Sequence, residues 1–181
     1  SLRDVERAVS CLLAQSRPMR SLDVIQHAIW GKCVVTSSLI MEALEAAVRP
    51  RPQNEPPEPA SDGTRYHIQQ LFIRLQNDAE IDQQRLATLE WAFLPILDEH
   101  SPARPKALHA WVQRDPGFFA EAVRICFHPR KQPKEERPAL DADEQARAHN
   151  AYTLLKSLKT LPGAKDDGSI DALQLQSWVN E

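Results

Sequence analysis

Glycine is scarce in this sequence, which has 5 glycines among 181 residues. The backbone approaches a phosphate or an oxyanion most closely at glycine, and neither a Gly-rich phosphate loop nor a G-x-S-x-G motif occurs. Long apolar runs are missing as well, because no stretch approaches the roughly 20 apolar residues that cross a bilayer. No positively charged start with an apolar run behind it indicates a signal peptide. The sequence therefore predicts neither a membrane span nor a phosphate-binding loop.

Charges of the two signs nearly cancel, with 22 Lys and Arg against 25 Asp and Glu and a formal net charge of −3. They are spread evenly along the chain, whereas nucleic-acid binding usually needs a basic surface that displaces phosphate counterions. The local exception is the basic stretch 128–134, which includes Arg130 and Lys131 but is followed at once by Glu135 and Glu136. We interpret this stretch as a solvated loop, so nucleic acid is not the expected partner.

Cysteine is rare, with Cys11, Cys33 and Cys126 widely spaced and no C-x-x-C pair. An odd count without the spacing of a disulfide framework favours a reducing compartment, so we expect a cytoplasmic protein. Cys126 falls on an apolar helical face, where a free cysteine behaves as a small hydrophobic residue. We therefore interpret the three thiols as buried and structural.

A helical repeat of apolar residues is the main feature that the sequence does contain. The i, i+3, i+4, i+7 template occurs in five separate segments and predicts an all-α fold, an irregular helical array or bundle. About nine helices are expected, and successive helices form antiparallel pairs. Their predicted ranges are 2–14, 21–30, 37–48, 65–77, 79–98, 105–113, 116–127, 142–159 and 171–180.

Polar residues and prolines indicate where several of these helices begin. Ser21 and Thr36 are candidate N-caps of the second and third helices, because a side-chain oxygen there can accept a backbone N–H. Asp115 lies directly before Pro116, and proline suits the first position of a helix, where its missing N–H has no consequence.

Two other residues indicate helix ends. Gly31 follows the second helix and is typical of a C-terminal cap. Pro95 lies within the predicted helix 79–98, where it cannot donate a hydrogen bond to the carbonyl of Trp91. We therefore expect this helix to kink or to end early.

Proline is abundant, with 14 residues in the chain. The stretch 49–64 holds five of them and favours extended, polyproline-like chain. We predict an N-terminal three-helix unit over 1–48 and a C-terminal helical unit over 65–181, with this stretch as the linker. One continuous domain with an exposed loop is the alternative, because three short helices bury little surface alone.

Motifs with a defined chemistry are not found. The stretch 163–171 has the aspartates of a calcium loop, but it places Gly163 and Lys165 at ligand positions, so no calcium is predicted. The six histidines show neither the H-E-x-x-H spacing nor another zinc pattern. We accordingly predict no catalytic residue, no cofactor and no metal ligand.

Aromatic residues are few, and most fall on apolar helical faces, where they are expected to be core anchors. Trp30 precedes Gly31 at a helix end, and Trp178 lies close to the last residue of the chain. These two tryptophans are the most exposed by position. With Arg130 and Lys131 they are our candidates for contact with a partner.

Several short phrases are similar to the helical C-terminal regions of large multidomain bacterial proteins of unknown function. They are LEWAFLPIL at 89–97, DPGFF at 115–119, AYTLL at 151–155, LPG at 161–163, DGSID at 167–171 and WV at 178–179. The resemblance spans roughly residues 66–181, and its motifs are structural, so it assigns no functional residue. It implies one segment of a longer polypeptide, with nucleotide-binding or effector modules upstream and a role in defence against phage.

We expect a non-enzymatic helical interaction or scaffold segment that binds another protein or another domain of its own polypeptide. One alternative is an enzyme whose site is assembled from dispersed residues. Its candidate residues are His67, His100 and His109. A second alternative is a helical nucleic-acid-binding module. It would use Arg130, Lys131, Lys134 and Arg137.

Overall fold

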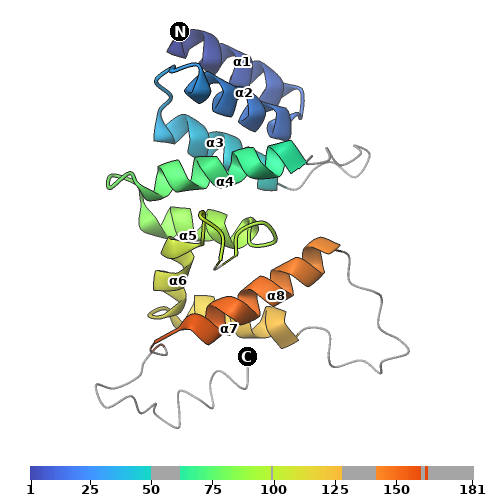
Figure 1. Ribbon diagram of the computed structural model, residues 1–181, viewed down its shortest axis with the longest axis vertical. Helices are drawn as coiled ribbons and strands as arrows, with labels where there is room; N and C mark the ends of the chain where they lie inside the picture. The colour runs from blue at the N-terminus through green and yellow to red at the C-terminus, as the bar shows by residue number, and fades with distance from the viewer. Residues whose placement is uncertain (50–61, 99, 128–141, 160–161, 163–181) are drawn as a thin grey trace. The chain divides into compact units, whose positions relative to one another are not determined.

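The fold is described from a computed structural model, which defines residues 1–49, 62–98, 100–127, 142–159 and 162. These residues form eight α-helices and no strand (Figure 1). The helices are α1 (Leu2–Ala14), α2 (Pro18–Trp30), α3 (Ser37–Val48), α4 (Asp62–Gln76), α5 (Gln83–Ala92), α6 (Lys106–Val112), α7 (Pro116–Phe127) and α8 (Ala142–Ser157). None of the helices in the described residues is long and apolar enough to cross a bilayer.

The prediction of an all-α protein is confirmed, and each of the eight helices overlaps one of the nine predicted ranges. The ninth, over 171–180, lies outside the described residues. The largest difference is at 79–98, where α5 covers only Gln83–Ala92. The chain before α5 forms a turn in which Asp78 Oδ1 accepts the Glu80 N–H at 3.0 Å.

The predicted helix starts are confirmed at two positions and wrong at a third. Thr36 caps α3, because its hydroxyl accepts the Leu39 N–H at 3.3 Å. Asp115 caps α7, and its Oδ1 accepts the Phe118 N–H at 3.1 Å. Ser21 does not cap α2, because the helix already begins at Pro18. Proline suits the first position of a helix, where an N–H would have no partner, so α2 starts one turn earlier than predicted.

Left-handed residues end α1 and α2, and neither of them is a glycine. Gly31 follows α2 as predicted, but it has an ordinary φ of −72°. The positive φ falls on the next residue, Lys32, at 60°, and Ser16 has a φ of 55° after α1. Behind Lys32, the Cys33 N–H donates to the Ala28 carbonyl at 2.9 Å, as in a Schellman motif.

Pro95 ends α5 early, as expected. The Trp91 carbonyl, which has lost its normal partner at Pro95, accepts a hydrogen bond from Arg147 Nη1 of α8 at 2.9 Å. Arg147 Nη2 donates to the Ala92 carbonyl at 3.0 Å, and Asn150 Nδ2 donates to the Leu94 carbonyl at 2.8 Å. Two polar side chains of α8 therefore supply hydrogen bonds to carbonyls at the C-terminal end of α5, including the Trp91 carbonyl that has lost its donor at Pro95.

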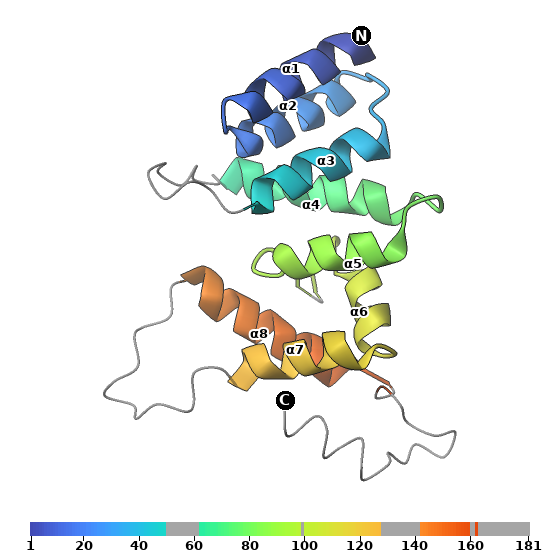
Figure 2. The same cartoon turned by 180° about the vertical axis from the view of Figure 1, so that it is seen from behind.

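The described residues divide into two compact units, Ser1–Asp82 and Gln83–Glu181. In the first, which we call unit 1, α2 contacts α1, α3 and α4 and lies at the centre (Figures 1 and 2). Its core is formed by apolar side chains from all four helices. The largest fully buried ones are Leu22, Ile25, Ile40, Leu44, Ile68, Leu71, Phe72 and Leu75.

The second, unit 2, consists of two packed helix pairs, α5 with α6 and α7 with α8, joined by contacts between α6 and α7. Its core includes Leu86, Leu94, Leu97 and Leu108. The side chain of Glu90 is also fully buried, and its Oε2 accepts the Leu108 N–H at 2.7 Å. Because Pro105 at the N-cap of α6 makes no side-chain hydrogen bond, Glu90 of α5 supplies the cap of α6.

The two compact units divide between Asp82 and Gln83, so that α4 belongs with the first three helices. The reason is packing, since the apolar face of α4 is fully buried and contacts α2 and α3. Three helices alone would leave part of the apolar surface of α2 exposed to water. The linker predicted at 49–64 lies mostly outside the described residues, and the predicted domain division stays a prediction.

Candidate functional site

A carboxylate–histidine pair joins α2 to α4 in unit 1. Asp23 Oδ1 lies 2.7 Å from His67 Nδ1, and the two side chains are 33% and 11% exposed. The Thr64 hydroxyl donates to Asp23 Oδ2 at 3.3 Å. Thr64 and His67 are three residues apart on α4, so both reach the same carboxylate. Because a carboxylate only accepts hydrogen bonds, the ring of His67 is held with its proton on Nδ1.

Aromatic rings surround the imidazole of His67. Its ring centroid lies 5.0 Å from that of Trp30, 5.2 Å from that of His27 and 6.2 Å from that of Tyr66. The rings of Trp30 and His27 meet it nearly edge to face, at 82° and 85°. His27 is itself fixed, because its Nδ1 lies 2.7 Å from the Asp23 carbonyl oxygen. We call Asp23, His27, Trp30, Tyr66 and His67 the Trp30 cluster.

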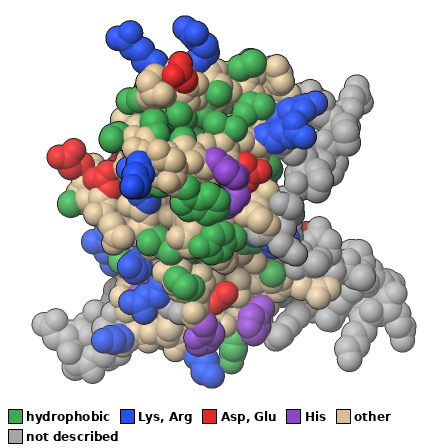
Figure 3. Space-filling view, turned by 45° about the horizontal axis from the view of Figure 1, so that its top comes forward, with side chains coloured by type: hydrophobic (Ala, Val, Ile, Leu, Met, Phe, Trp, Pro, Cys, Tyr) green, Lys and Arg blue, Asp and Glu red, His purple; other side chains and the backbone are tan. Residues whose placement is uncertain are grey.

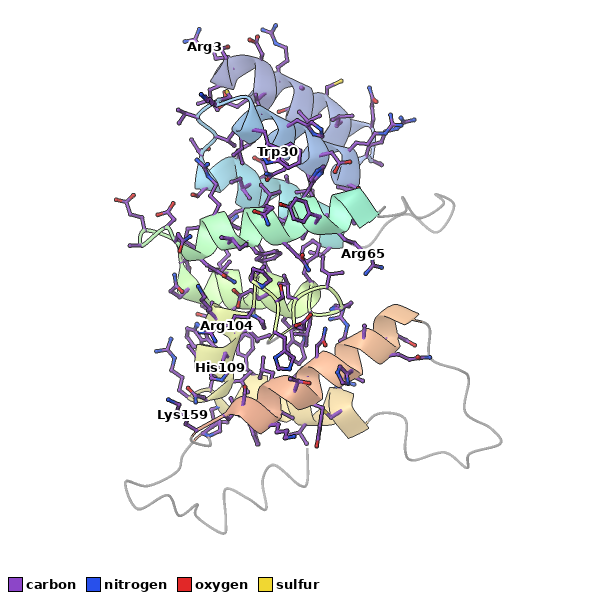
Figure 4. The ribbon with its side chains drawn as sticks, viewed as in Figure 1. Arg3, Trp30, Arg65, Arg104, His109 and Lys159 are labelled. Atoms are coloured by element: carbon purple, nitrogen blue, oxygen red, sulfur yellow. The ribbon has the colours of Figure 1, made fainter. Side chains whose placement is uncertain are left out.

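The cluster is buried at its centre and exposed at its edges. His67 is 9% exposed, whereas Trp30 is 53% and Tyr66 is 51% exposed. In Figure 3, histidine side chains lie among hydrophobic ones near the middle of the view, with acidic side chains beside them. Figure 4 labels Trp30 in the upper part of the ribbon. Two large aromatic side chains on the surface are thus supported from beneath by a hydrogen-bonded histidine.

The chemistry available to the cluster is recognition or proton transfer. A carboxylate that holds the Nδ1 proton orients the other nitrogen of an imidazole, as in general acid–base sites. The hydroxyl of Thr64 is directed to Asp23 rather than placed as a separate nucleophile. Among the described residues, no three His, Cys, Asp or Glu side chains gather in a way that could hold a metal ion. The exposed rings of Trp30 and Tyr66 are the groups of the cluster that are suited to recognition.

The structure places the other predicted site residues apart from this cluster. Trp178, Arg130 and Lys131 lie outside the described residues, as does the calcium-like stretch 163–171. His100 and His109 belong to unit 2, whereas His67 belongs to unit 1. The N–H of His100 donates to Asp98 Oδ1 at 2.8 Å and closes a turn. His109 lies in α6 and lines a cavity that is described below.

The cysteines are free, but the interpretation of all three as buried is wrong. Cys11 is exposed, and Cys33 and Cys126 are half-buried. Cys11 lies on the solvent side of α1, where only Val9 is fully buried. A single-sequence pattern shows the apolar face of a terminal helix but not how much of that face a neighbour covers.

Sequence reasoning found Trp30 but missed Asp23, His27 and Tyr66. The available signal was the i, i+4, i+7 spacing of Asp23, His27 and Trp30, which places the three on one face of α2. That spacing does not show that α4 covers this face and brings His67 to Asp23. The pair joins residues that are 44 positions apart in the chain.

Comparison with known proteins finds no family model, no curated protein and no solved structure that significantly matches this chain. The resemblance to C-terminal helical regions of bacterial multidomain proteins therefore stays a prediction. Any functional conclusion depends on the residues of the chain itself.

Proposed function

We propose that this chain is a non-enzymatic helical interaction segment and that the Trp30 cluster is its contact face. The partner is another protein or another domain of the same polypeptide. The observation that supports the proposal is the pair of half-exposed aromatic rings, Trp30 and Tyr66, that both lie beside the buried imidazole of His67.

Residue type and rigidity both favour a contact role for this face. Tryptophan and tyrosine are enriched among the residues that dominate binding energy, because they offer a large contact area and lose few rotatable bonds. Here Trp30 is also held against His27 and His67, so little side-chain entropy remains to be lost on binding. A single exposed valine would offer neither this contact area nor this support from neighbouring rings.

The chemistry of the two rings indicates what the partner offers. Among the described residues, neither the indole N–H of Trp30 nor the hydroxyl of Tyr66 makes a hydrogen bond. A partner that buries these groups must supply acceptors, because a buried donor without an acceptor costs about 1–3 kcal/mol. We therefore infer a protein surface with an apolar pocket for the indole and with carbonyl or carboxylate oxygens at its rim.

The test begins with a photo-activated cross-linking residue at Val34, which is 74% exposed and follows α2. Cross-linking in the native cell identifies the partner, and the purified partner is then titrated with Trp30→Ala, Tyr66→Ala and Tyr152→Ala. Tyr152 is the matched control, because it is an equally exposed tyrosine (57%) but belongs to unit 2.

We expect Trp30→Ala to raise the dissociation constant about 30-fold, which is the effect of losing a residue worth about 2 kcal/mol at an interface. The Tyr152→Ala variant should bind within about twofold of the parent chain. Unchanged binding by both Trp30→Ala and Tyr66→Ala, with helicity intact, would refute the proposal.

A further inference from the structure

Unit 2 contains a cavity of about 520 Å³ at the junction of α6 and the end of α8. It lies in a different unit from the Trp30 cluster, so it is independent of the proposed contact face. Its lining residues are Arg104, Pro105, Lys106, His109, Ser157 and Lys159. Figure 4 shows Arg104, His109 and Lys159 on the same side of unit 2.

The walls of this cavity are anchored in the core of unit 2. Pro105 is buried, and α6 behind it is held by the fully buried side chains of Leu108 and Val112. The other wall is the last turn of α8, where the Ser157 hydroxyl donates to the Leu154 carbonyl at 2.7 Å. Leu154 is fully buried. Lys106, His109 and Ser157 are therefore carried on packed helices, and Arg104 and Lys159 lie within two residues of the ends of those helices.

The described part of the lining is cationic, although the whole chain carries a formal net charge of −3. Among the residues that the structure describes, it contains one arginine, two lysines, a histidine and a serine, and no aspartate or glutamate. Among the described residues, Lys106 and Lys159 form no ion pair. Like charges around one cavity repel each other, and an anion between them removes this repulsion.

We propose that this cavity binds a small ligand with a phosphate group, of about the size of a nucleotide. Guanidinium and ammonium groups are donors that recognise phosphate oxygens, and the lining offers both, from Arg104, Lys106 and Lys159. The volume falls within the roughly 300–1,000 Å³ of small-molecule sites, which leaves room for an organic part beside the phosphate.

We assign the recognition to side chains, because α6 is only 7 residues long and its Leu108 N–H already donates to Glu90 Oε2 at 2.7 Å. Single substitutions should therefore have clear effects. A nucleic acid would present phosphates too, but the charges converge on a cavity instead of following an extended track, which favours a small ligand.

The test is isothermal titration calorimetry of the full chain at low salt, with ATP, pyrophosphate and inorganic phosphate as probes and adenosine as the uncharged control. We expect binding of ATP or pyrophosphate, none of adenosine, and affinity that falls as salt increases. Lys106→Gln and Lys159→Gln should each weaken binding about tenfold. Both lysines are exposed, so neither substitution should impair folding.

The matched control is Lys156→Gln, because Lys156 is an exposed lysine of the same helix turn as Ser157 but does not line the cavity. This variant should bind within about twofold of the parent chain. No binding of any of the three phosphate probes would overturn the proposal. Equal weakening by all three lysine variants would do so too. Affinity only for a DNA or RNA oligonucleotide, rising with its length, would assign the charges to a nucleic-acid surface instead.

Discussion

Arg147 is expected to stabilise unit 2 through its hydrogen bonds to the end of α5. It donates to the Trp91 and Ala92 carbonyls at 2.9 and 3.0 Å, at the end of α5 where Pro95 cannot donate to the Trp91 carbonyl. Replacing it with methionine removes both hydrogen bonds but keeps an unbranched apolar stem of similar length. The substitution Arg147→Met thus tests the hydrogen bonds rather than the packing.

The expected loss follows from the type of bond. A hydrogen bond from a charged donor contributes about 1.5–3 kcal/mol net, and the two bonds here share one half-buried guanidinium. Their effects are therefore not additive, and water can partly replace the lost donors. We expect a loss of about 2 kcal/mol, which is about a 30-fold change in the unfolding equilibrium constant.

The assay is urea unfolding followed by tryptophan fluorescence in a Trp30→Phe background. Trp30 is the only one of the four tryptophans in unit 1, so the remaining signal reports unit 2. The control is Arg124→Met, because Arg124 pairs with Glu121 on the exposed surface of α7. Exposed pairs contribute only about 0.2–1 kcal/mol, so this variant should be nearly as stable as the parent.

Two results would refute the reasoning. If Arg147→Met and Arg124→Met lower the free energy of unfolding equally, the carbonyls at the end of α5 do not need the guanidinium. If only the slope of the transition changes, the substitution acts on the compactness of the unfolded or folded state instead.

Three further predictions concern single residues. Glu90→Leu leaves the Leu108 N–H buried without an acceptor and should destabilise unit 2 by about 2 kcal/mol in urea unfolding. Lys32→Gly should stabilise unit 1 by up to about 1 kcal/mol in thermal unfolding, because glycine adopts a φ of 60° without strain. Hydrogen bonds from the Ser37 hydroxyl and the Glu80 N–H lower the pKa of Asp78, so their stabilisation is present above the unfolded pKa of about 4 and is lost as pH falls through the lower folded value. Ser37→Ala should therefore destabilise the chain at pH 7 and have little effect near pH 2.

Each of these predictions has a conservative control. Glu90→Gln keeps an acceptor for the N–H and should cost less than Glu90→Leu; an equal cost would mean that volume matters rather than the cap. Lys32→Ala removes the same charge but keeps a Cβ, so a stabilisation as large as that of Lys32→Gly would argue against the φ explanation. Ser38→Ala alters the exposed neighbour of Ser37 and should show no pH-dependent effect.

The helices themselves follow from local sequence. The apolar repeat predicted the all-α class, and Thr36 and Asp115 cap helices where the sequence places them. Pro95 ends α5 for a reason that is visible in the sequence alone. Such signals act within about one helical turn, so neighbouring residues are enough to read them.

Contacts between helices could not be read in the same way. The sequence shows that Pro95 frees the Trp91 carbonyl, but only the fold brings Arg147 to it from 56 residues away. The cap that Glu90 provides for α6 is also a tertiary contact, over 18 residues. Local patterns could not predict either partner, because both depend on which helix faces pack together.

The candidate site likewise depends partly on local sequence and partly on contacts between helices. Sequence alone identified Trp30 as exposed, from its place beside Gly31 at the end of a helix. Only the tertiary structure decided that α4 belongs with α1–α3, and so brought His67 and Tyr66 to the indole ring. The physical reason is that burial of apolar area is non-directional and selects helix neighbours by the fit of whole faces, which no short window of sequence contains.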